Sequence, residues 1–101
     1  PPDPKRTWAV TFTERAREQL AWLEARGVEL EPALVAALSL GPEPHAYRRI
    51  KKDGDAMRIA VKAWRARFRV EGRTIEVLEL QSGFRRKERP ELHQDFDTEV
   101  G

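Results

Sequence analysis

Residues 63–72, AWRARFRVEG, place an arginine at every second position between apolar residues. Neighbouring side chains of a β-strand point to opposite faces of the sheet, so this alternation predicts a strand with two unlike faces. The apolar face would consist of Trp64, Ala66, Phe68 and Val70. The basic face would consist of Arg65, Arg67 and Arg69. A fold that contains this strand must therefore bury one side of its sheet and leave the other side in contact with solvent.

The first half of the chain has the pattern of a short strand followed by two amphipathic helices. Residues 8–12 alternate enough to form the strand. Thr13 offers a hydroxyl cap to a first helix that runs to about Arg26, where Gly27 ends it. Pro32 suits the first turn of a second helix, because its missing amide hydrogen is not needed there. The buried side of this second helix would consist of Leu34, Val35 and Leu38.

The second half changes from a helical period to a period of two. The four expected strands cover residues 47–51, 57–61, 64–70 and 74–80. Asp53-Gly54 is a strong hairpin signal because both residues tolerate positive φ, and Gly72 supplies a later turn. Pro90 then opens one or two helical turns. This order predicts an α+β domain, in which an N-terminal strand and a helix hairpin pack on one face of a four- to five-stranded antiparallel sheet.

Two-residue turns between the last strands determine the expected register. With a turn at residues 71–72, Phe68 lies opposite Ile75, and Glu76 lies opposite Arg67. The face opposite the helices then collects Arg58, Lys62, Arg65, Arg67 and Arg69. Like charges this close favour a surface that binds an anion. The alternative is a cross-strand ion pair between Arg67 and Glu76, which would need no ligand.

Charge is distributed unevenly along the chain, whose net charge is +2. Residues 48–89 hold fourteen basic and six acidic side chains, whereas both flanking segments are mildly acidic. A basic centre of this kind suggests a polyanionic partner such as nucleic acid. A charged surface that is simply solvated remains the alternative.

Length and composition limit the class of protein. The 101 residues suit one domain, residues 8–101, preceded by a disordered arm, residues 1–7. No apolar run approaches the roughly 18 residues of a membrane span, so we expect no membrane partner and a cytoplasmic location by default. The absence of cysteine excludes disulfide scaffolds and thiolate zinc sites. No metal-ligand spacing stands out, and we therefore expect neither a metal nor a cofactor.

Two segments, MRIAVKAWRARFRVEGRTIEVLEL and RKERPELH, resemble the RelE/ParE superfamily of bacterial toxin–antitoxin toxins. The stretch GFRRKERPEL is also similar to the HigB branch. The resemblance implies a RelE-like fold and a type II toxin that cuts messenger RNA on the ribosome without a metal, held inactive in a hetero-oligomer with its antitoxin. In such members a 2′-hydroxyl attacks the adjacent phosphate, which requires nearby cations and groups that move protons. The alternatives are a ParE-like toxin that inhibits DNA gyrase by binding it, or a catalytically decayed homologue that binds nucleic acid.

The resemblance also assigns roles to individual residues. Arg58, Arg65 and Lys87 match basic residues that hold the phosphate. His93 takes the place of a terminal tyrosine that moves protons, and its alternative role is that of a surface histidine on a terminal helix. The wider RNA-binding set comprises Lys51, Lys52, Lys62, Arg67, Arg69, Arg85, Arg86 and Arg89. Ala60 departs from the pattern, because RelE has a second lysine there, and Lys62 or Lys52 would have to substitute for it.

Overall fold

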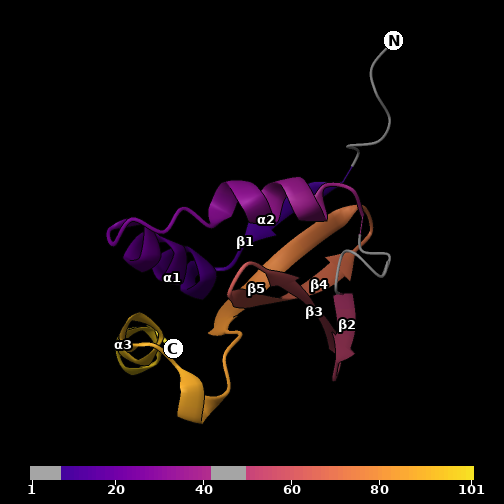
Figure 1. Cartoon of the computed structure of the whole chain (residues 1–101). Helices are drawn as coiled ribbons and strands as arrows, with labels where there is room; N and C mark the ends of the chain where they lie inside the picture. Colours follow the sequence, from indigo (N-terminus) through magenta and orange to yellow (C-terminus); the bar gives the residue numbers. More distant parts are fainter. Residues whose placement is uncertain (1–7, 42–49) are drawn as a thin grey trace.

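The computed structural model describes residues 8–41 and 50–101. Its elements are β1 (Ala9–Phe12), α1 (Glu14–Glu24), α2 (Glu31–Leu38), β2 (Ile50–Asp53), β3 (Ala56–Val61), β4 (Trp64–Glu71), β5 (Thr74–Ser82), the 3-10 turn η2 (Arg86–Glu88) and α3 (Glu91–Glu99). The five strands form one sheet in the order β1-β5-β4-β3-β2. Helix α2 lies over one face of this sheet, and α1 and α3 pack beside β5 (Figure 1). The α+β class is therefore confirmed, whereas the predicted arm at residues 1–7 lies outside the described residues.

The sheet is mixed, so the prediction of a purely antiparallel sheet was wrong for one strand. Strand β1 pairs with β5 in parallel, and all other neighbours are antiparallel. A parallel pair needs a long connection between its strands, and the two helices and the β2–β4 meander supply it here. The sequence pattern identified β1 but could not determine its direction beside β5.

Thr13 joins the first helix to the sheet. Its Oγ1 accepts a hydrogen bond from the Ala16 amide at 3.1 Å, which is the predicted N-cap. The same hydroxyl donates to the Leu78 carbonyl at 2.6 Å. Beyond the end of α1, Gly27 adopts a φ of 85°, as a glycine stop requires. One side chain therefore both starts α1 and fixes it against β5.

Helix α2 confirms two of its three predicted core residues. Leu34 and Leu38 are fully buried, since residues four apart lie on one side of a helix. Val35 is instead 37% exposed. It follows Leu34 directly and is turned roughly 100° around the helix axis, away from the sheet.

Two hairpins are shifted by one residue from their predicted positions. The turns lie at residues 54–55 and 72–73, with φ of 65° at Gly54 and 61° at Gly72. In each case the glycine takes the first turn position rather than the second. Phe68 consequently lies opposite Val77, not Ile75. A register shift between Arg67 and Phe68 displaces residues 64–67 by one further residue.

A buried glutamine forms hydrogen bonds with the backbone of β5 beyond the end of β1. Strand β1 ends opposite Val77, and the amide and carbonyl of Leu80 further along β5 need other partners. Gln19 of α1 supplies them: its Oε1 accepts from Leu80 N at 2.6 Å, and its Nε2 donates to Leu80 O at 3.3 Å. The same Nε2 donates to the Val100 carbonyl at 2.9 Å. Gln19 therefore joins α1, β5 and the end of α3.

Candidate nucleic-acid interface

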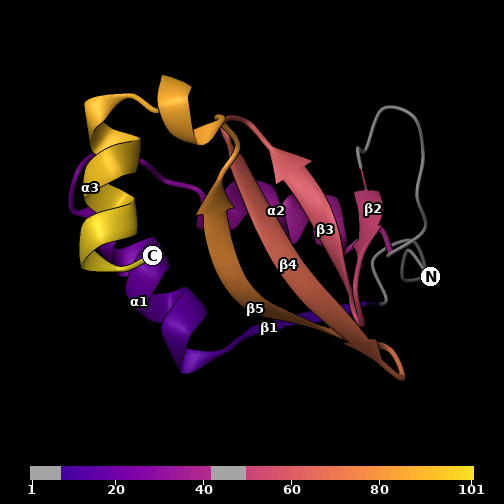
Figure 2. The ribbon, with the colours of Figure 1, turned by 90° about the horizontal axis from the view of Figure 1, so that it is seen from below.

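Strand β4 has the two unlike faces that its sequence predicts. Trp64, Ala66 and Phe68 are buried in the core beneath the helices. Arg65 and Arg67 are partly exposed and Arg69 is exposed, on the opposite side of the strand. Figure 2 looks onto this side, with α2 behind the sheet. The basic side of β4 is therefore open to solvent.

Three basic side chains from three strands surround a small depression on this open face. Lys51 of β2 lies opposite Arg58 of β3, and Ala60 lies opposite Arg65 of β4. The depression has a volume of about 90 Å³, and we call it the basic hollow. It is lined by Lys51, Arg58, Ala60 and Arg65. Ala60 forms part of this lining, at the position where RelE has a lysine.

The charges of Lys51 and Arg58 are not balanced within residues 8–41 and 50–101. Neither side chain forms an ion pair or hydrogen bond with any of these residues. Arg58 also lies directly opposite Arg67 on its other side. Like charges facing each other across a sheet destabilise it, and a bound anion removes that repulsion. The basic hollow is thus suited to a phosphate.

Arg67 is balanced by a carboxylate. Its Nη1 lies 3.0 Å from Glu79 Oε2, and the other oxygen of Glu79 lies 3.1 Å from Arg15 Nε. Arg67 thus forms a cross-strand ion pair, but the predicted partner Glu76 was wrong, and the partner is Glu79. The displaced turn moves Glu76 opposite Arg69, and the register shift between Arg67 and Phe68 brings Glu79 opposite Arg67. The β5 side of the open face is therefore partly neutralised, unlike the β2–β3 side.

Arg65 lies at the end of the sheet where β4 begins. Its Nη1 donates to the Trp64 carbonyl at 2.8 Å. A Cβ atom placed on Gly83 would lie 2.7 Å from the Arg65 Cζ and 2.8 Å from the Ala63 carbonyl oxygen. Only glycine leaves this space, so Gly83 determines where the Arg65 guanidinium can lie. Sequence reasoning missed Gly83, which carried no signal beyond being a glycine at the end of a strand.

Further basic residues surround the same end of the sheet. Lys62 is exposed in the β3–β4 turn, where it adopts a φ of 55°. Figure 2 shows the η2 segment beside this turn. Residues 84–88 are all exposed, and they include the cations Arg85, Arg86 and Lys87 and the acidic Glu88. We call residues 84–89 the basic loop.

Two residues of the predicted RNA-binding set lie elsewhere. Lys52 pairs with Met57, which packs against the core, so alternation directs it away from Lys51 and the basic hollow. Arg89 forms an ion pair with Asp97 of α3, and its Nε donates to the Phe84 carbonyl at 3.1 Å. Arg89 therefore fixes the basic loop to α3.

His93 is buried, 5% exposed, on the core side of β4. Its ring stacks on Trp64 at a centroid distance of 4.0 Å, and its Nδ1 lies 2.6 Å from Ser82 Oγ. Burial lowers the pKa of His93 from its usual 6.5, and nearby Arg89 lowers it further, while Asp97 acts in the opposite direction. His93 is thus neutral at pH 7. The structure does not bring it to the basic hollow, because α3 extends further than predicted and turns His93 inward, one turn before the buried Phe96.

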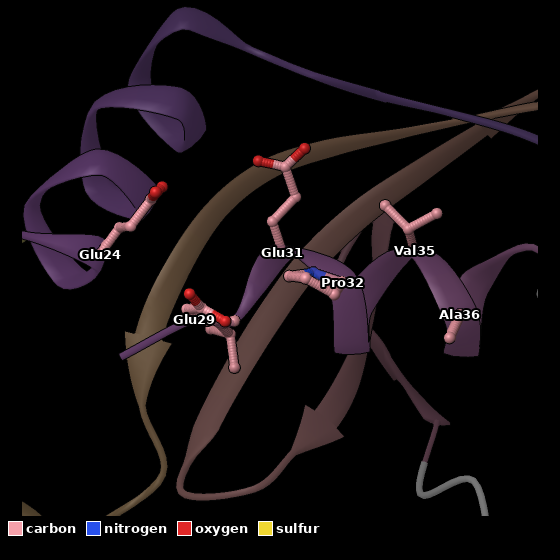
Figure 3. Close-up of a pocket in the computed structure, with 7 residues that line it drawn as sticks. Glu24, Glu29, Glu31, Pro32, Val35 and Ala36 are labelled. Carbon is pink, nitrogen blue, oxygen red and sulfur yellow. The ribbon is translucent and has the colours of Figure 1, made fainter. Parts of the chain in front are cut away.

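An apolar hollow lies on the helices, away from the open sheet face. It has a volume of about 470 Å³ and combines three carboxylates with an apolar lining. The residues drawn and labelled in Figure 3 are Glu24, Glu29, Glu31, Pro32, Val35 and Ala36. Its negative charge opposes the binding of phosphate, whereas the basic hollow carries the opposite charge.

Within the described part of the chain, no group of three histidine or acidic side chains could hold a metal ion. The helices described here are all too short or too polar to cross a membrane.

Comparison of the fold with solved structures finds two toxin–antitoxin complexes. The RelE–RelB complex from the archaeon Pyrococcus horikoshii OT3 contains a chain that matches with a TM-score of 0.61 and 19% identity, over 78% of this chain and 98% of that one. The fold is RelE-like. The RelBE2 complex from Mycobacterium tuberculosis matches with a TM-score of 0.51 and 20% identity, over 80% of this chain and 97% of that one. No protein-family model and no curated protein matches the sequence.

In this RelE-like fold the predicted residues form three groups. Arg58 and Arg65 meet at the basic hollow, where Lys51 joins them. Lys62 and the exposed part of the basic loop lie near the Arg65 end of the sheet (Figure 2). The residues outside both groups are Lys52, Arg67, Arg69, Arg89 and His93. Lys51, rather than Lys52 or Lys62, is the lysine that lines the hollow beside Ala60.

Proposed function

We propose that this chain is the toxin of a type II toxin–antitoxin system and that its open sheet face binds messenger RNA on the ribosome. The observation that carries the proposal is the unbalanced charge of Lys51 and Arg58 at the basic hollow, in a RelE-like fold. A phosphate placed there gains charge-assisted hydrogen bonds and relieves the repulsion between the two side chains.

The proposed reaction is cleavage of RNA by its own 2′-hydroxyl. The bond from the 2′ oxygen to phosphorus forms and the bond to the 5′ oxygen breaks, while one proton leaves the 2′ oxygen and one reaches the 5′ oxygen. Arg58 and Arg65 stabilise the negative charge that develops on the phosphoryl oxygens, and they do so without a metal ion. The basic loop, including Lys87, follows the neighbouring backbone phosphates.

The proposed partner in the inactive state is an antitoxin that covers the same face. Both similar structures are toxin–antitoxin complexes. Acidic side chains of such a partner would balance Lys51 and Arg58 in place of RNA, so antitoxin and message compete. The complex would be a hetero-oligomer in the cytoplasm, where ribosomes translate the message.

One observation favours a second candidate function, a homologue that binds RNA without cutting it. His93 is buried in the core, and Ala60 lines the hollow at the position of a family lysine. Neither position supplies a group that moves protons at a phosphate in the hollow. Binding would then persist in the absence of cleavage.

Induction of the chain in a bacterial host tests these candidates. We expect growth arrest and new 5′ ends in messenger RNA by primer extension, both lost in the Arg58→Ala/Arg65→Ala double variant. Arg17→Ala, which removes an exposed arginine of α1, is the matched control and should behave like the original chain. Arrest that survives the double substitution contradicts the proposal. RNA binding without new 5′ ends selects the second candidate, and arrest with gyrase trapped on DNA selects a ParE-like toxin.

A further inference from the structure

Phe84 is a large apolar side chain that remains 39% exposed at the start of the basic loop. Its ring meets the His93 ring at 4.9 Å and 88°, and His93 stacks on the buried Trp64. A perpendicular contact leaves at least one face of the Phe84 ring free of His93. A row of three rings thus leads from the core to the surface and ends in an accessible aromatic ring.

The backbone on both sides of this ring is fixed. The Phe84 amide donates to Ser82 Oγ at 3.1 Å, and Ser82 Oγ in turn contacts His93 Nδ1. The Phe84 carbonyl accepts from Arg89 Nε at 3.1 Å, and Arg89 is held by Asp97. An aromatic ring held in this way loses little conformational entropy when a ligand binds to it.

The charged residues that follow Phe84 in the basic loop are mostly cationic, and Glu88 is the one acidic residue among them. The next three residues, Arg85, Arg86 and Lys87, are all exposed. A ring that docks a protein normally lies among other anchor side chains that cluster near the centre of the interface. A single ring beside several cations matches a nucleotide better, because a nucleotide combines a flat base with an anionic phosphate.

We propose that Phe84 is the stacking surface for one unpaired base of a single-stranded RNA whose phosphates are held by the basic loop. This inference rests on the proposed function, because it names how the RNA bound at the open face is positioned. It also gives His93 a positioning role through Phe84, in place of the proton-transfer role that the resemblance implies.

The test is fluorescence anisotropy with a labelled single-stranded RNA that carries 2′-O-methyl groups, which prevent cleavage by the 2′ oxygen. Matched oligonucleotides lack the base at one position each. Phe84→Ala should weaken binding about 5- to 150-fold, the range for loss of one stacked base. Phe84→Leu, which keeps the apolar volume, should weaken binding too, and Phe84→Tyr should retain it. Leu40→Ala removes another exposed apolar side chain, 49% exposed beyond α2, and should have no effect.

The decisive comparison combines the Phe84→Ala variant with the oligonucleotides that lack one base. Loss of the stacked base should weaken binding to the original chain but not to Phe84→Ala, whose dependence on salt should stay unchanged because no phosphate contact is lost. Equal losses with both chains, or no effect of Phe84→Ala, overturn the inference while leaving RNA binding in place. If Phe84 contacts a protein instead, RNA affinity will not depend on it. Absence of RNA binding by the original chain overturns the proposed function together with this inference.

Discussion

The two faces of β4 come from the same eight residues but serve different purposes. On one face, Trp64, Ala66 and Phe68 leave water completely or almost so, and burial of apolar area stabilises the fold. On the other face, Arg65 lies opposite Ala60 of β3, and Arg67 lies opposite Arg58. Alternation thus separates buried apolar side chains from solvent-exposed cations within one strand. A substitution on one face should leave the property of the other face intact.

A second contrast divides the open face itself. Towards β5, Arg67 shares Glu79 with Arg15. Towards β2, Lys51 and Arg58 face each other with no acidic partner among the described residues. The basic hollow therefore stands out by its uncompensated charge rather than by its size.

The largest expected effect is on the buried face. Phe68→Ala removes a fully buried ring and should lower the free energy of unfolding by about 3–5 kcal/mol, measured by urea denaturation. Arg69→Ala, the adjacent exposed residue, is the control and should change it by less than about 0.5 kcal/mol. Similar effects of the two substitutions would mean that the faces do not differ as described.

Gly83→Ala tests whether the glycine after β5 positions the Arg65 guanidinium. The added methyl group would contact both Arg65 and the Ala63 carbonyl. Because the backbone cannot yield as a flexible side chain can, we expect a loss of about 1–3 kcal/mol in unfolding free energy and weaker RNA binding. Thermal unfolding and anisotropy measure the two effects. An unchanged protein would show that Gly83 does not position Arg65.

His93 should make stability depend on pH. Its pKa is lowered in the folded state, so the unfolded state binds more protons between that pKa and 6.5. The free energy of unfolding should therefore fall as the pH is lowered below about 6.5. His93→Asn should show a shallower dependence over the same range, measured by urea denaturation at each pH. Identical slopes would indicate that His93 is not buried as a neutral ring.

The smallest effect on stability concerns Lys51. Lys51→Ala relieves repulsion with Arg58 and should raise the free energy of unfolding by roughly 0.2–1 kcal/mol. Glu79→Gln is the opposite case. It removes the carboxylate that Arg67 and Arg15 share and should lower the free energy of unfolding slightly. A loss of stability in Lys51→Ala would mean that its charge is compensated after all.

Alternation made the strands and the two faces of β4 predictable from sequence, because it is a local property. The position of each turn glycine and the shift at Arg67 depend on strand twist and pairing, and these moved the expected partner from Glu76 to Glu79. Lys51 was already in the predicted RNA-binding set, but its position beside Arg58 at the basic hollow depends on the pairing of neighbouring strands. The sequence also favoured Lys52 and Lys62 as substitutes near Ala60, since distance along the chain does not reveal which lysine shares a face.

The burial of His93 is the feature of the candidate site that was hardest to predict from the sequence. Its burial depends on how α3 packs against β5 and α1, through contacts with residues far away in the sequence. A signal was present, since Leu92, Phe96 and Val100 recur every four residues and indicate an amphipathic helix. The RNA-related roles of the basic residues remain predictions.

The most direct test of the basic hollow is the dependence of RNA affinity on salt. The Lys51→Ala/Arg58→Ala double variant is compared with the original chain and with Arg17→Ala, using the 2′-O-methyl RNA. Loss of two phosphate contacts should weaken binding and reduce the slope of log K against log salt by about 1.4. The same affinity and slope in all three proteins would contradict the claim that the open sheet face binds RNA through its unbalanced cations.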